Sequence, residues 1–146
     1  MGVLWMGYFQ GGLGRFDPRT GKFEVYKKDA EKPTSLSGDI VWSLFEDQQN
    51  VLWVSTWNGL NKVLPRSTSF EVIGQKTSQT DGLTDTHVEE VLLDKQGNLW
   101  AGTWAGLERI DAVSGTSELF RVNGDSASGT PSEMILSLHQ DQAGEL

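Results

Sequence analysis

The side chains best suited to proton transfer or metal binding in this 146-residue chain are two histidines, His87 and His139. Either imidazole could act as an acid, a base or a metal ligand near neutral pH. They lie far apart, at no spacing typical of a zinc site, and the chain has no cysteine. No Gly-x-Ser-x-Gly motif and no phosphate-binding glycine loop is present. The sequence therefore predicts no catalytic residue, no metal site and no cofactor, and a protein that is not an enzyme.

Three aspartates recur every 47 residues, at Asp47, Asp94 and Asp141. Repeated carboxylates could hold calcium, but this series lacks the alternating acidic loop and the terminal glutamate of a calcium-binding hand. Each aspartate instead precedes a glycine or an asparagine by three residues, which is typical of a hairpin turn whose N–H groups bind the carboxylate. We expect these residues to cap turns.

The six tryptophans fall into two groups. Three follow a leucine at regular intervals and are expected in the core, because one binding site could not require the same residue three times: Trp5, Trp53 and Trp100. The other three are Trp42, Trp57 and Trp104. Exposed aromatics at these positions would suit stacking on a sugar or contact with a protein partner, and packing between adjacent units is the alternative.

Composition excludes several classes of partner. The chain has 12 basic and 20 acidic residues, for a net charge of -8, which opposes binding to phosphate backbones and anionic lipids. No apolar run approaches the roughly 20 residues of a membrane-spanning helix, and the first residues given lack the basic-then-apolar order of a signal peptide. We expect neither nucleic acid nor a membrane as a partner of this segment.

An internal repeat of about 47 residues organises the chain. The Leu-Trp pairs mark it, and so do Gly-Leu pairs that begin at Gly12, Gly59 and Gly106. The units span residues 3–50, 51–98 and 99–146, and a one-residue insertion separates Trp5 from Gly12. Within each unit, short strand-like segments alternate with turn residues, and almost no helical periodicity is present.

Four strands fit each unit. The expected inner strands are residues 40–46, 88–93 and 133–140, and the expected second strands are 52–56 and 99–103. A third strand follows each Gly-Leu pair, as in 107–110, and the fourth is expected at 23–26 and 120–122. Tandem four-stranded units of this length predict an all-β fold made of β-propeller blades.

Two segments resemble the two-component regulator propeller repeat. One reads DKQGNLWAGTWAGL (residues 94–107), and the other, which leads into an inner strand, reads SLSGDIVWSLFED (residues 35–47). The resemblance implies the periplasmic sensor region of a bacterial signal-transduction receptor that binds a ligand or a protein. The alternative is a propeller enzyme, a lyase or a hydrolase, with its site at the channel mouth.

The longest and least similar loops, residues 27–39, 74–86 and 123–132, join one unit to the next. In a propeller such loops gather at one end of the channel, where recognition residues are common. A small molecule or an oligosaccharide is the expected ligand. The candidate ligand-binding residues are Trp42, Asp39, Asp85, His87, Trp57 and Trp104.

The order of strands along the chain also predicts self-association. The first unit is expected to begin at a second strand and the last to end in an inner strand, so that the two halves are complementary. Three blades cannot readily close, because propellers have four to eight. We expect a head-to-tail homodimer that forms a six-bladed ring, and the competing interpretation is a fragment of a longer propeller.

Overall fold

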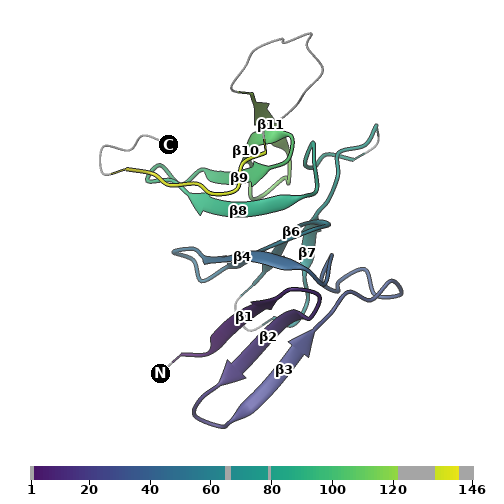
Figure 1. Ribbon diagram of the computed structural model, residues 1–146, viewed down its shortest axis with the longest axis vertical. Coiled ribbons are helices and arrows are strands. Elements are labelled where there is room, and N and C mark those ends of the chain that lie inside the picture. Colours follow the sequence, from purple (N-terminus) through teal and green to yellow (C-terminus); the bar gives the residue numbers. More distant parts are fainter. Residues whose placement is uncertain (1, 65–66, 79, 122–133, 142–146) are drawn as a thin grey trace.

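The computed structural model describes residues 2–64, 67–78, 80–121 and 134–141. These residues form eleven strands and no helix (Figure 1). The strands are β1 (Leu4–Tyr8), β2 (Gly12–Asp17), β3 (Lys22–Tyr26), β4 (Val41–Glu46), β5 (Leu52–Thr56), β6 (Gly59–Val63), β7 (Glu71–Ile73), β8 (Val88–Leu93), β9 (Leu99–Thr103), β10 (Gly106–Ile110) and β11 (Ser117–Phe120).

The strands make three antiparallel sheets that follow one another along the chain (Figure 1). The first has the order β1-β2-β3, the second β4-β5-β6-β7 and the third β8-β9-β10-β11, so each strand pairs with its neighbours in sequence. The predicted all-β class is confirmed, and the expected strands at 52–56, 88–93 and 99–103 agree residue for residue with β5, β8 and β9.

One strand begins three residues earlier than predicted. The fourth strand of the last unit was expected at 120–122, but β11 covers Ser117–Phe120 and Arg121 follows it. The predicted bounds make Phe120 the first residue of its strand, as Phe23 is in the first unit. In the sheets, Leu107 pairs with Phe120 just as Leu13 pairs with Tyr26, so Phe120 corresponds to Tyr26.

The last predicted inner strand is not a strand in the described residues. The first sheet has three strands, and its unit was expected to begin at a second strand. Residues 134–141 run beside the third sheet (Figure 1), where the Ile135 N–H donates to the Thr103 carbonyl at 3.0 Å. A strand requires a hydrogen-bonded ladder with a partner. The described residues provide no such ladder for this segment, and Glu133 lies outside them.

The apolar cores lie between sheets rather than within them. One cluster joins the first and second sheets and includes Leu13, Val54 and Val63. The other joins the second and third sheets and includes Trp53, Leu60 and Val91. β5 is buried along its whole length because it is covered by a sheet on each face. Each unit therefore completes its core only against its neighbour.

Hydrogen bonds join consecutive sheets at equivalent positions. The Gly12 N–H donates to the Asp39 carbonyl, and the Gly59 N–H donates to the Thr86 carbonyl, each at 2.8 Å. Gly59 has a φ of 121°, and a Cβ there would lie 2.8 Å from the Ile73 carbonyl oxygen. Glycine is required because a side chain would be strained and would collide with the backbone.

Candidate ligand-binding surface

Five aromatic rings from all three sheets form a continuous row, which we call the aromatic strip: Phe9, Trp42, Trp57, His87 and Trp104. Ring centroids lie 6.1 Å apart for Phe9 and Trp42 and 6.4 Å apart for Trp42 and Trp57. Trp57 and Trp104 meet edge to face at 5.1 Å. Phe9 is 69% exposed, Trp42 39% and Trp104 38%, so the strip faces solvent.

Equivalent turns present three of these rings. Phe9 follows β1 and precedes Gly12, which begins β2. Trp57 lies in the same way between β5 and β6, and Trp104 between β9 and β10. Threonine hydroxyls shape two of the turns: Thr56 Oγ1 donates to the Gly59 carbonyl at 3.0 Å, and Thr103 Oγ1 donates to the Gly106 carbonyl at 2.9 Å. The sequence prediction missed Phe9, although its place after β1 matched those of Trp57 and Trp104.

β-Bulges position the residues that lie between these turns. The register of β4 with β5 shifts between Val41 and Ser43, and that of β8 with β9 shifts between Val88 and Glu90. The extra residues are Trp42 and Glu89. A bulge bends its strand and redirects a side chain, and bulges are common beside binding sites. Trp42 thereby joins the strip, and Glu89 accepts a hydrogen bond from Trp104 Nε1 at 2.8 Å.

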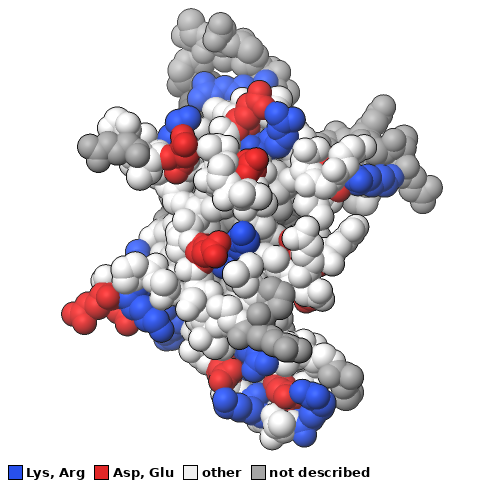
Figure 2. Space-filling model, turned by 180° about the vertical axis from the view of Figure 1, so that it is seen from behind, with Lys and Arg blue, Asp and Glu red and all other residues white. Residues whose placement is uncertain are grey.

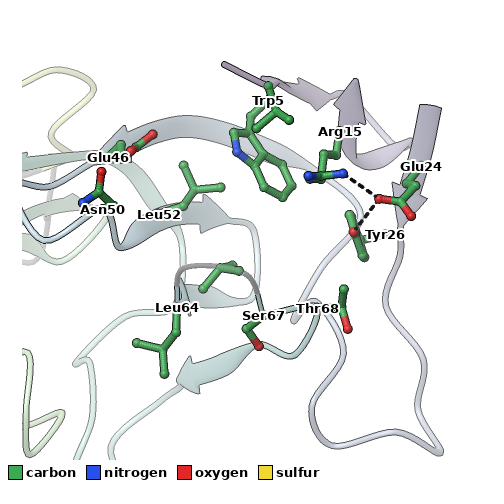
Figure 3. Close-up of a pocket in the computed structure, with 12 residues that line it drawn as sticks. Trp5, Arg15, Glu24, Tyr26, Glu46, Asn50, Leu52, Leu64, Ser67 and Thr68 are labelled. Atoms are coloured by element: carbon green, nitrogen blue, oxygen red, sulfur yellow. Dashed lines mark hydrogen bonds and ion pairs between the residues drawn. The ribbon is translucent and has the colours of Figure 1, made fainter. Parts of the chain in front are cut away.

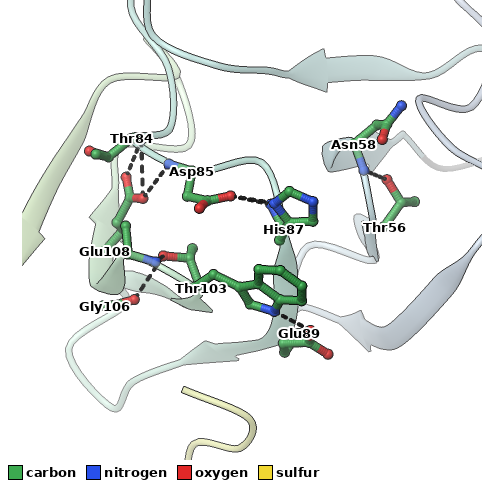
Figure 4. A network of polar contacts seen from close by, with 11 residues as sticks. Thr56, Asn58, Thr84, Asp85, His87, Glu89, Thr103, Gly106 and Glu108 are labelled. Carbon is green, nitrogen blue, oxygen red and sulfur yellow. Dashed lines mark hydrogen bonds and ion pairs between the residues drawn. The ribbon is translucent and has the colours of Figure 1, made fainter. Parts of the chain in front are cut away.

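His87 is held by the carboxylate of Asp85 (Figure 4) and by two aromatic rings. Its ring stacks on Trp104 at 4.5 Å and meets Trp57 edge to face at 4.4 Å. Its Nδ1 lies 2.7 Å from Asp85 Oδ1, which also accepts the His87 backbone N–H. Because an ionised carboxylate only accepts hydrogen bonds, Nδ1 is the donor and Nε2 is directed away from Asp85.

The buried Glu108 supports the loop that carries Asp85 (Figure 4). Its side chain is 0% exposed. It accepts hydrogen bonds from the Thr84 N–H at 2.9 Å, the Asp85 N–H at 3.3 Å and the Ser117 hydroxyl at 2.5 Å. A buried carboxylate is tolerable only when its oxygens are hydrogen-bonded. These bonds join the loop before β8 to the third sheet.

The structure brings together five of the six candidate ligand-binding residues: Trp42, Trp57, Trp104, His87 and Asp85. The sixth, Asp39, is engaged elsewhere. Its Oδ1 accepts the Lys28 N–H at 2.7 Å, and its carbonyl accepts the Gly12 N–H. Asp39 thus closes its own loop and makes no described contact with the strip.

The other histidine, His139, lies in the segment 134–141 and is exposed. No group of three or more His, Asp or Glu side chains that could hold a metal occurs within the described ranges. The aromatic strip offers ring stacking, and Asp85 and Glu89 beside it accept hydrogen bonds.

The repeated aspartates and tryptophans bind each other. Trp53 Nε1 donates to Asp47 Oδ2 at 3.1 Å, and Trp100 Nε1 donates to Asp94 Oδ2 at 2.8 Å. The other carboxylate oxygen of each aspartate accepts two backbone N–H groups of its turn. Burial raises the pKa of Asp94, but the hydrogen bonds from Trp100 and Asn98 lower it by more. The pKa of Asp94 is therefore below its usual value. The turn after Asp141 lies outside the described residues.

A cross-strand ladder that the sequence prediction missed repeats in every sheet. A tryptophan on β1, β5 or β9 pairs with a cation on the next strand, and that cation pairs with a glutamate on the strand after it. In the first sheet, Arg15 lies 5.9 Å from the Trp5 ring centroid and 3.0 Å from Glu24. In the second sheet the ladder is Trp53, Lys62 and Glu71, and in the third it is Trp100, Arg109 and Glu118.

A cavity of about 460 Å³ lies between the first and second sheets. Figure 3 shows Trp5, Arg15 and Tyr26 on one side, with Glu46 and Asn50 on the other. The corresponding space between the second and third sheets is about 190 Å³, and there Lys62 Nζ reaches the Ala112 carbonyl at 3.3 Å. The cavity contains none of the candidate residues, so the aromatic strip is the better-supported site.

On the face seen in Figure 2, charged side chains do not define a separate site. Figure 2 shows acidic and basic side chains interspersed over the face that it presents, with no broad patch of one sign. None of the described segments forms a helix long and apolar enough to cross a membrane.

Comparison with known proteins supports the resemblance seen in the sequence. The family described as two component regulator propeller matches residues 35–58 and 82–105, which contain β4, β5, β8 and β9. These two segments are similar to the two-component regulator propeller repeat. They also contain Trp42, Trp57, His87 and Trp104. No curated protein matches the chain.

Solved structures share the fold of this chain. The extracellular domain of BT3049 from B. thetaiotaomicron, described as a hybrid two component system, is 21% identical with a TM-score of 0.78 over 97% of this chain and 18% of its own. The extracellular domain of BT4673, described as a one component system of that organism, is 18% identical with a TM-score of 0.51, over 97% and 24%. PorZ of the Porphyromonas gingivalis type-IX secretion system is 14% identical with a TM-score of 0.54, over 96% and 28%. This chain therefore spans only 18–28% of the length of these structures.

Proposed function

We propose that this chain is part of the sensory, ligand-binding propeller of a bacterial signal-transduction receptor, and that it acts on the extracytoplasmic side of the membrane. The family match and the likeness to extracellular domains of two-component and one-component systems support this assignment. The observation that carries it is the aromatic strip, a row of exposed rings from all three sheets.

We propose a neutral oligosaccharide as the ligand of the strip. Aromatic side chains present apolar faces, and the exposed rings of Phe9, Trp42 and Trp104 could stack on sugar rings. Glu89 is close enough to the strip to bind sugar hydroxyls, because it already accepts the Trp104 N–H. The net charge of -8 opposes an anionic ligand.

A panel of neutral and acidic oligosaccharides tests the proposal by tryptophan fluorescence and isothermal titration. We expect a neutral member to bind, and Trp42→Ala and Trp104→Ala each to weaken binding about tenfold, or about 1.4 kcal/mol. Phe23→Ala is the matched control, because Phe23 is an aromatic that is 48% exposed but lies on β3 outside the strip. Binding by both tryptophan variants as tightly as by the wild type would refute the assignment.

A second candidate function, a lyase or hydrolase, is favoured by the pair of His87 and Asp85, whose 2.7 Å contact orients the imidazole as a general base requires. Chromatography of oligosaccharides after incubation with the protein separates the two functions. A sensor returns its ligand unchanged. Cleavage that is lost in His87→Gln would establish the enzyme instead.

A further inference from the structure

The two four-stranded sheets supply the aromatic strip with different chemistry at equivalent positions. In the second sheet, Trp57 on the turn after β5 is accompanied by Trp42 at the bulge of β4. In the third sheet, Trp104 on the turn after β9 is accompanied by Glu89 at the bulge of β8. The 47-residue repeat relates Trp42 to Glu89. One sheet therefore pairs a ring with a second ring, and the next pairs a ring with a carboxylate.

One face of Trp104 is not covered by the neighbouring rings of the strip. The His87 ring is stacked on the indole at 4.5 Å and is nearly parallel to it, and Trp57 lies 5.1 Å away. His87 and Trp57 lie only 4.4 Å from each other, so both rings are on the same side of Trp104. Since Trp104 is 38% exposed, its opposite face is a platform on which a sugar ring can stack.

Glu89 gives this platform a hydrogen-bond acceptor at its edge. An indole N–H lies in the plane of its ring, so the carboxylate that accepts the Trp104 N–H at 2.8 Å lies beside the ring rather than over its face. The bond uses Oε1 of Glu89, and Oε2 accepts no hydrogen bond from the described residues. Because an ionised carboxylate only accepts, it favours a sugar unit with a free hydroxyl and disfavours an ether, an ester or an anion at that place.

Trp42 offers the opposite kind of hydrogen bond. An indole nitrogen is a donor only, and Trp42 Nε1 has no acceptor among the described residues. The side chain is 39% exposed, and its ring lies 6.1 Å from Phe9 and 6.4 Å from Trp57. A donor within a group of apolar rings suits an acetyl group, because the methyl can pack on the rings while the carbonyl accepts the N–H.

We propose, on the basis of the oligosaccharide assignment above, that the strip selects a neutral oligosaccharide that carries acetyl groups. Trp42 and Trp57 bind the acetylated part, and the Trp42 N–H is donated to the acetyl carbonyl. Trp104 stacks on an adjoining sugar unit, and Glu89 Oε2 accepts a free hydroxyl of that unit. An acetylated sugar is uncharged, which agrees with the net charge of -8 on the chain.

Matched pairs of sugars test whether an acetyl group is recognised. N-acetylchitohexaose and cellohexaose share one backbone and differ in an acetamido group in place of a hydroxyl, and O-acetylated xylohexaose is paired with xylohexaose. Isothermal titration with the full chain measures each affinity. We expect the acetylated member of one pair to bind about tenfold more tightly than its partner. A preference in the first pair identifies an amide-linked acetyl group, and a preference in the second identifies an ester-linked one.

Two variants assign this preference to residues. Trp42→Phe keeps an aromatic ring but removes the N–H, so it should lose the preference for the acetylated member. Glu89→Gln keeps an oxygen that can accept the Trp104 N–H but loses the charge, so both members should bind about tenfold more weakly. Glu90→Gln is the matched control and should bind both members as the wild type does, because Glu90 lies on the same strand but accepts the Ser43 hydroxyl at 2.7 Å.

Three results overturn the proposal: equal affinity for both members of each pair, a preference that survives in Trp42→Phe, or wild-type affinity in Glu89→Gln. If the paired sugars do not bind but another neutral member of the panel does, this proposal is wrong and the assignment of an oligosaccharide stands. If no neutral oligosaccharide binds, both are wrong. Near-UV circular dichroism shows that each variant keeps its folded core.

Discussion

Replacing Trp53 with alanine tests whether the sheets are held together by the contacts between them. Trp53 is 2% exposed, and it belongs to the cluster that joins the second sheet to the third. A tryptophan buries about 150–250 Å², worth at most about 4–6 kcal/mol at about 25 cal/mol per Å². Truncation of a buried tryptophan typically costs about 3–5 kcal/mol. The substitution also removes the indole bond to Asp47 and the contact with Lys62.

Urea unfolding at one fixed protein concentration, followed by circular dichroism, measures this effect. We expect Trp53→Ala to lower the free energy of unfolding by about 3–5 kcal/mol, a large share of the 5–15 kcal/mol that stabilises a typical domain. Trp104→Ala is the control, with an expected loss of about 1 kcal/mol or less because Trp104 is 38% exposed. Equal losses in the two variants would refute the view that Trp53 is a core residue and Trp104 a surface residue.

Two further predictions concern the repeated turns. The pKa of Asp94 is lowered in the folded state, so its contribution to stability is present above the unfolded pKa of about 3.9 and is lost as the pH falls through the folded pKa. Asp94→Asn should therefore flatten the acid limb of stability against pH in urea titrations, and an unchanged acid limb would contradict this account. Gly59→Ala should cost about 1–3 kcal/mol in the same assay because of its positive φ, whereas Gly74→Ala, with open space around its Cβ position, should cost little.

The repeated positions could be predicted from the sequence because backbone geometry and core packing impose the same residue in each unit. Gly59 and Gly106 occupy turns with positive φ, and Trp53 and Trp100 each donate to the aspartate of the preceding turn. Such constraints act within one sheet or between neighbours. They therefore recur every 47 residues. The predicted bounds of the strands between these positions, such as β5 and β9, agree with the structure.

The composition of the binding surface was less predictable because it depends on loop conformation. Asp39 and Asp85 both precede inner strands, yet Asp39 accepts the Lys28 N–H while Asp85 binds His87. Nothing in the residue types distinguishes these two outcomes. Phe9 was missed because the insertion before Gly12 obscures its equivalence to Trp57 and Trp104. The paired charges of Arg15 and Glu24 could have been found, since the same nine-residue spacing recurs in the other units.

The bulged positions suggest how one scaffold can acquire different ligands. Trp42 and Glu89 occupy equivalent bulges, one in each complete sheet, and both side chains meet the aromatic strip. Val41 and Val88 are buried, so core packing restricts which residues can stand there. The bulge residue that follows each of them is not paired in the ladder, so its residue type is less restricted. Substitution at Trp42 or Glu89 should therefore change ligand binding while leaving the pairing of β4 and β8 intact, because recognition and folding depend on different residues of the same strand.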